Sequence, residues 1–202
     1  MIRTMPTGSA KLFLAIERID QANANDPNRV EEAGQSVPAE LLYSRRMTHW
    51  LERLYPAADE PLQLAARAQH IRRWEIPRSS YPMNRIGYLK WRTTLYGFHA
   101  DAAEQILRDV GYDDSVIARV RSLLKKERIK TDPDGQALED VICLCFLENY
   151  FADFAPRHDE EKVIGILRKT WAKMSPVGHA AALALPMRDD AKRLVEKALT
   201  AF

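Results

Sequence analysis

The chain has 202 residues, a formal net charge of +2 and a hydrophobic fraction of 46%. This length suffices to bury a continuous core, and the small charge argues against a dedicated nucleic-acid binder, although local basic clusters leave contact with phosphates open. No run approaches the roughly 18 uninterrupted apolar residues of a membrane helix, so we expect a soluble, cytoplasmic protein whose two cysteines stay reduced.

Apolar residues recur at intervals of three and four, which is the helical period, and alternating strand patterns are nearly absent. Pro38 lies at the first turn of one predicted helix, where proline is tolerated. Asp59 and Glu60 open another, where acidic side chains suit the positive end of the helix dipole. In chain order, we expect helices over residues 9–22, 39–54, 59–74, 91–110, 113–126, 137–154, 158–174, 179–185 and 189–199.

The connections and the apolar content of these helices indicate the architecture. Residues 23–38 form a polar loop, and residues 75–91 carry two prolines and a glycine, which is typical of a specialised surface loop. Residues 137–154 form the most apolar helix, so we place it at the centre of the bundle. The sequence predicts an all-α, single-domain bundle over residues 1–202, with residues 175–202 as a C-terminal helical annex.

Three of the five histidines lie in consecutive apolar segments, and an acidic residue lies in a fourth. A catalytic divalent metal takes about three protein ligands and leaves a position for water, whose pKa it lowers. His49, His70 and Asp140 would supply such ligands from three separate helices, and His99 would be a further ligand or a proton carrier. Taken singly, each histidine is more often a surface or core residue with one hydrogen bond, so this prediction depends on the set.

Several arginines lie close to His70 in the sequence. The planar guanidinium group of arginine can donate two parallel hydrogen bonds to a phosphate or a carboxylate. Arg92 lies just beyond the loop, whose tryptophans and tyrosines would form a stacking wall. The alternative is that the arginines lie on a solvated helix face and the aromatic residues lie in the core. The predicted substrate-binding residues are Arg67, Arg72, Arg73, Arg78 and, from a second basic run, Lys126.

The segments MTHWLERL, LAARAQHIRRWEIP, FHADAAEQIL and ALEDVICLCFLENY resemble the helices of the HD-domain superfamily, most of whose members are metal-dependent phosphohydrolases. The resemblance matches His49 to the lone histidine of that family, His99 to a later histidine and Asp140 to the closing aspartate. The His-Asp doublet of the family falls on Gln69 and His70. Because an amide is a poor metal ligand, the implied metal set is His49, His70, His99 and Asp140, and it favours zinc, iron or manganese.

Nearly the whole chain also resembles a family known as domain of unknown function 4202. The phrases that carry this resemblance are DPNRV, PAELLYSRRM, AQHIRRWEIPR, SYPMNRIGYLKWR, KTDPDGQALEDV and HDEEKVIGILRKTW. The resemblance is specific, but it implies no activity and no oligomeric state.

Together these observations predict a metal-dependent, phosphohydrolase-like enzyme that acts on a small anionic or phosphorylated metabolite, with His99 and Gln69 as catalytic residues. Two alternatives stay open. One is a non-catalytic nucleotide- or RNA-binding protein on a degenerate HD scaffold. The other is an iron-dependent, HD-like oxygenase that uses the same ligand set.

Overall fold

The computed structural model describes residues 7–129 and 131–200. In this part of the chain the secondary structure is almost entirely helical, which confirms the predicted all-α fold. The α-helices are α1 (Thr7–Asn23), α2 (Ala39–Leu54), α3 (Glu60–Ala68), α4 (Arg85–Val110), α5 (Asp114–Leu124), α6 (Pro133–Asn149), α7 (Phe151–Phe154), α8 (Glu160–Trp171), α9 (Pro176–Leu183) and α10 (Asp189–Leu199). Short 3-10 turns cover η1 (Arg73–Glu75), η2 (Arg78–Ser80) and η3 (Ala155–Arg157), and the strands are β1 (Arg29–Glu32) and β2 (Gln35–Pro38).

Local side chains set several helix ends. The carboxylate of Asp59 accepts a hydrogen bond from the backbone N–H of Leu62 at the start of α3, and the Asn84 side chain does the same for Gly87 at the start of α4. These contacts satisfy N–H groups that have no partner inside the helix. Gly111 ends α4 with a φ of 87°, a left-handed conformation that glycine adopts without strain.

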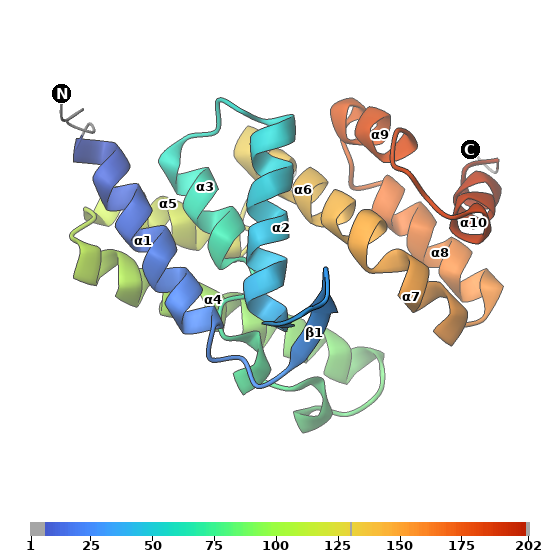
Figure 1. The fold of residues 1–202 in the computed structure, drawn as a ribbon, viewed down its shortest axis with the longest axis horizontal. Coiled ribbons are helices and arrows are strands. Elements are labelled where there is room, and N and C mark those ends of the chain that lie inside the picture. The colour runs from blue at the N-terminus through green and yellow to red at the C-terminus, as the bar shows by residue number, and fades with distance from the viewer. Residues whose placement is uncertain (1–6, 130, 201–202) are drawn as a thin grey trace.

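The core is centred on α6, as its apolar sequence predicts. This helix packs against α2, α3, α5, α7 and α9, and most of its side chains are buried. Figure 1 shows α6 running between the N-terminal helices and the C-terminal group α8–α10. In that group α10 packs on α8, and α9 packs on α6. Because α6 touches both ends of the bundle, one continuous core supports the whole fold.

Several segments depart from the predicted elements. Helix α4 begins at Arg85, inside the predicted loop of residues 75–91. Residues 29–38 form a two-stranded antiparallel hairpin instead of an irregular loop. Its turn residues Ala33 and Gly34 both have positive φ, which matches the twist that a two-residue hairpin turn needs. The predicted helix 59–74 ends early, at Ala68.

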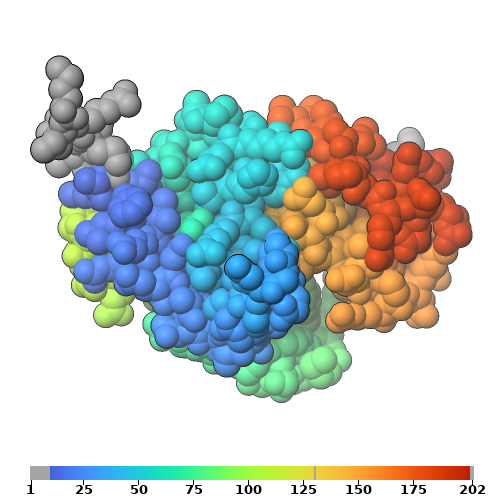
Figure 2. Space-filling view, in the orientation of Figure 1, coloured from blue at the N-terminus to red at the C-terminus, as the bar shows by residue number. Residues whose placement is uncertain are grey.

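After α3 ends at Ala68, the chain passes through η1 and η2 to the start of α4. The start of α4 projects at the lower edge of the molecule beside the hairpin (Figure 2). No helix among the described residues is long and apolar enough to cross a membrane.

Candidate functional site

A tight turn follows α3 and is held by side chains from two other helices. The backbone N–H of Arg72, which has a φ of 53°, donates to Oδ1 of Asn23 at 3.0 Å. The backbone carbonyl of Ile71 accepts a hydrogen bond from Nδ1 of His99 at 2.8 Å. A non-glycine residue in the left-handed region is strained, so these tertiary bonds stabilise the turn. The turn thereby fixes the position of Gln69 and His70.

Beside this turn lies a cavity of about 100 Å³ between α4, the end of α5 and α6. The side chains around it are mainly cationic, aromatic and imidazole groups. They are Gln69, His70, Arg73, Tyr88, Trp91, Arg92, Leu95, Tyr96, His99, Lys126 and Ile142. Of the residues predicted to be catalytic or to bind substrate, Gln69, His99, Arg73 and Lys126 therefore meet in one place.

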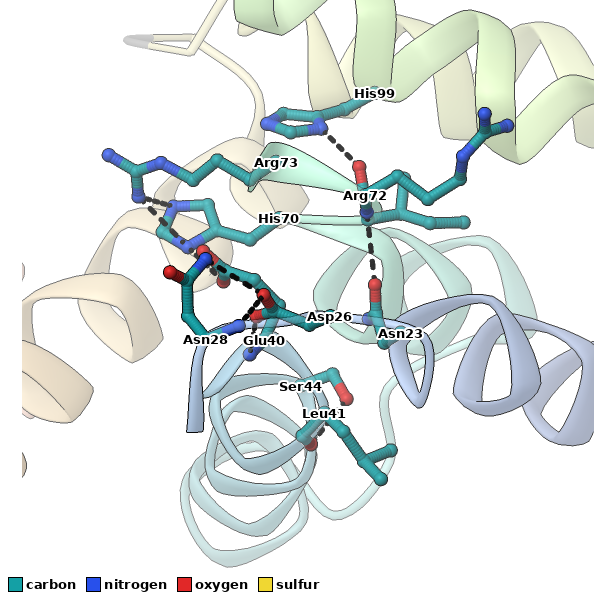
Figure 3. Close-up of polar contacts among 11 residues, drawn as sticks. Asn23, Asp26, Asn28, Glu40, Leu41, Ser44, His70, Arg72, Arg73 and His99 are labelled. Atoms are coloured by element: carbon teal, nitrogen blue, oxygen red, sulfur yellow. Dashed lines mark hydrogen bonds and ion pairs between the residues drawn. The ribbon is translucent and has the colours of Figure 1, made fainter. Parts of the chain in front are cut away.

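His99 is a neutral imidazole with a defined tautomer. Burial lowers its pKa to about 3, and the neighbouring His70 adds to this effect. A carbonyl oxygen only accepts hydrogen bonds, so Nδ1 of His99 carries the proton that it donates to Ile71. The lone pair of the ring is then on Nε2, which is buried and has no hydrogen-bond partner among the described residues. In Figure 3 this nitrogen lies on the side of the ring nearer the Arg73 guanidinium.

Gln69 presents a second buried acceptor of the same kind. Its side chain is 4% exposed, and its Oε1 atom has no hydrogen-bond partner in the described part of the chain. Most buried polar atoms in folded proteins are paired. Two residues that line one cavity therefore each carry a buried acceptor that no donor of the described residues reaches.

His70 lies between a carboxylate and a guanidinium (Figure 3). Oε2 of Glu40 is 3.2 Å from Nδ1 of His70, and Nη1 of Arg73 is 2.9 Å from Nε2. The ring of Tyr43 stacks on the imidazole with 3.9 Å between centroids. Burial lowers the pKa of His70 well below its usual value, with Arg73, Lys126 and Arg92 adding to the effect. The neutral ring donates from Nδ1 to Glu40, and its Nε2 accepts a hydrogen bond from Nη1 of Arg73.

Two of the three cationic groups of the cavity have no carboxylate partner among the described residues. Neither Arg73 nor Arg92 forms a salt bridge within the described residues, although both are half-buried, and Lys126 pairs with Glu139. Arg73 instead lies over the ring of Trp91 at 5.0 Å from its centroid. Half-buried guanidinium groups without a counter-charge favour an anion in the space between them.

The other predicted substrate-binding arginines lie outside this cavity and pair with protein groups. Nε and Nη2 of Arg67 donate to the two oxygens of the Asp20 carboxylate, and Nη1 donates to the Thr48 hydroxyl. Arg72 pairs with Glu75. Arg78 donates to backbone carbonyls of the loop that leads to α4. All three stabilise local structure.

The predicted metal ligands do not converge. His70 and His99 lie with their ring centroids 6.0 Å apart, but His49 is exposed on α2 beside Trp50. Asp140 accepts four hydrogen bonds in another part of the core, from Tyr55, from Gln136 and from both the backbone N–H and the hydroxyl of Ser175. Within residues 7–129 and 131–200, no group of three or more His, Cys, Asp or Glu side chains is placed to hold a metal ion. The four-residue set is therefore corrected to two histidines.

Sequence reasoning left several residues out of the predicted site. Arg92, Tyr96 and His99 lie four and three residues apart on α4, a spacing that places them on one helix face. That periodicity was a usable signal for Arg92 and Tyr96. No comparable pattern points to Glu40, because its position beside His70 depends on how α2 packs against the turn.

Comparison with known proteins yields one family and no relative of known activity. No curated protein and no solved structure matches the chain. The model of the family described as a domain of unknown function, DUF4202, matches residues 14–195. This match spans most of the chain, including every residue of the cavity. The protein therefore belongs to the DUF4202 family.

Proposed function

We propose that this protein binds a small phosphorylated metabolite in the cavity beside the α3 turn. The observation that carries the proposal is that Arg73 and Arg92, both half-buried and without a carboxylate partner among the described residues, line the same small space as Lys126. A phosphate monoester provides the negative charge that Arg73 and Arg92 lack, and acceptor oxygens for their N–H groups that do not already bind His70 and Tyr96. Tyr88 and Trp91 supply an apolar wall for the rest of the ligand.

The size and charge of the cavity favour this ligand class over nucleotides and metal ions. A volume of about 100 Å³ suits a phosphate with a short carbon chain better than a whole nucleotide. A metal cation would meet the guanidinium of Arg73, which already lies 2.9 Å from Nε2 of His70. Because His49 and Asp140 lie elsewhere, the residues present do not fit the metal site that the resemblance to HD-domain proteins implies.

The proposal is tested by calorimetric titration of the protein with glycerol phosphate, propyl phosphate and, as the uncharged reference, glycerol. We expect both esters to bind and glycerol not to bind. Arg92→Gln should weaken binding of both esters about tenfold or more, because a hydrogen bond to a charged group contributes roughly 1.5–3 kcal/mol.

Arg85→Gln is the matched control, since Arg85 is an exposed residue two turns earlier on the same helix and does not line the cavity. Ester affinity should change little in this variant. Absence of binding by either ester at millimolar concentration, or equal losses in the two variants, would contradict the proposal.

Hydrolysis of the bound ester is a second candidate function, and the Glu40–His70 contact favours it. With Nδ1 of His70 donating to Glu40, Nε2 is the basic atom and faces the cavity wall shared with Arg73. If Arg73 moves onto the phosphate, a water molecule gives its proton to Nε2 while its oxygen bonds to phosphorus. The bond between phosphorus and the ester oxygen breaks, the leaving oxygen takes a proton from solvent water, and Nε2 returns its proton to solvent.

Release of inorganic phosphate from glycerol phosphate tests this step. We expect turnover that persists in EDTA and disappears in His70→Gln, while the ester still binds to that variant. Turnover that requires added zinc, manganese or iron would contradict the metal-free route. No turnover under any condition would leave ligand binding as the function of the site.

A further inference from the structure

Two residues that line the cavity carry buried acceptors that a phosphate group cannot satisfy. Nε2 of His99 and Oε1 of Gln69 are buried and have no hydrogen-bond partner among the described residues, and the side chains that carry them are 2% and 4% exposed. The oxygens of a phosphate dianion accept hydrogen bonds and donate none. A ligand that filled the site with phosphate and hydrocarbon alone would leave both acceptors unpaired, which is unfavourable inside a protein.

The missing donors must come from an uncharged group. An ammonium group carries donors, but it would lie close to the cationic side chains of Arg73, Arg92 and Lys126. An alcohol hydroxyl donates one hydrogen bond without adding positive charge. Hydroxyl groups next to the phosphate therefore fit both the charge and the hydrogen bonding of this cavity.

We infer that the ligand is a short polyol phosphate, whose phosphate lies between Arg73, Arg92 and Lys126 and whose hydroxyls donate to His99 and Gln69. This inference rests on the proposed function and extends it to a substrate class. The cavity volume of about 100 Å³ limits the carbon chain to a few atoms.

The experiment compares glycerol phosphate with propyl phosphate, which have the same three-carbon chain and charge but differ by two hydroxyls. We expect wild-type protein to bind glycerol phosphate about tenfold more tightly, in keeping with a buried acceptor that gains its donor. In Gln69→Met the ratio of the two affinities should fall toward one. Gln105→Met on the exposed side of α4 is the control, and there the ratio should stay as in the wild type.

The outcomes separate this inference from the proposed function. Equal binding of the two esters by wild-type protein, or tighter binding of propyl phosphate, overturns the polyol assignment and leaves phosphate recognition standing. Failure of both esters to bind overturns phosphate recognition, and the polyol assignment with it. If Gln69→Met does not fold, the wild-type comparison alone decides.

Discussion

Two polar clusters lie inside this helical bundle and differ in how their hydrogen bonds are met. Between α6 and α9, the fully buried Asp140 accepts four hydrogen bonds from three side chains and one backbone amide. Beside the turn after α3, Gln69 and His99 each keep a buried acceptor without a partner in the described part of the chain. A saturated cluster joins elements of the fold, whereas an unsaturated cluster on a cavity wall is suited to a ligand.

The largest effect should come from breaking the saturated cluster. Asp140→Ala leaves donors on Tyr55, Gln136 and Ser175 without their acceptor and separates α9 from α6, so we expect a loss of about 3 kcal/mol or more in the free energy of unfolding. Urea unfolding measures it. Asp153→Ala, an exposed acidic residue on α7, should change the same quantity by about 0.5 kcal/mol at most.

A different result would exchange the roles of the two clusters. If Asp140→Ala keeps its stability and loses affinity for glycerol phosphate, Asp140 contacts the ligand. The assignment of this residue to the fold would then be wrong.

The next effect concerns pH and the two imidazoles of the cavity. In the folded protein the pKa of His99 is about 3, below the roughly 6.5 of an unfolded histidine, so the unfolded chain binds a proton that the folded chain does not. The contribution of neutral His99 to the free energy of unfolding is therefore present above pH 6.5 and is lost as the pH falls toward 3. His70 contributes with the same sign, and Glu40, whose pKa burial raises, contributes with the opposite sign.

Replacing His99 alone isolates its contribution to the pH dependence of the unfolding free energy. His99→Gln keeps an amide donor for the Ile71 carbonyl, and between pH 6 and 4 its stability should fall less steeply than that of the wild type, by about 1.4 kcal/mol per pH unit. The contribution of Glu40 is common to both proteins and largely drops out of the comparison. Urea unfolding at pH 7, 6, 5 and 4 supplies the two slopes. Parallel slopes would mean that His99 carries a proton in the folded state.

The same contrast explains which parts of the structure could be predicted from the sequence. Helix periodicity and end residues such as Asp59 and Gly111 are local signals, so the all-α fold and the central place of α6 could be predicted. The turn after α3 could not, because bonds from Asn23 and His99 stabilise it against the helical preference of its own residues. Since that turn determines which arginines face the cavity, the sequence alone could not distinguish Arg73, which lines the cavity, from Arg67, which does not.

The metal set fails for a related reason. A polar residue inside an apolar helical segment has the same sequence pattern whether its partners are protein groups or a ligand. Asp140 and His99 share that pattern and differ only in tertiary contacts. Both lie in apolar helical segments and both are buried, but spacing carried no information on what each of them contacts.

A smaller effect should appear when the unsatisfied acceptor is removed. Gln69→Met replaces an amide whose Oε1 has no partner among the described residues by an apolar side chain of similar length, so the protein without ligand should gain about 1 kcal/mol in unfolding free energy. Gln136→Met is the matched control, because its amide donates to Asp140 and to the Lys173 carbonyl and its loss should destabilise the protein. A loss of stability in Gln69→Met would show that its amide already has a partner.

The smallest effect is expected at His49, the first residue of the predicted metal set. Its side chain is exposed on α2, and its aromatic contact is an edge-on approach to Trp50 with 6.4 Å between centroids. His49→Ala should therefore change the unfolding free energy by no more than about 0.5 kcal/mol and leave the affinity for glycerol phosphate as it is. His70→Ala, on the cavity wall, should weaken that affinity, because it removes the ring that positions Arg73. Equal losses in the two variants would mean that His49 does reach the ligand, and the division between cavity and surface histidines would not hold.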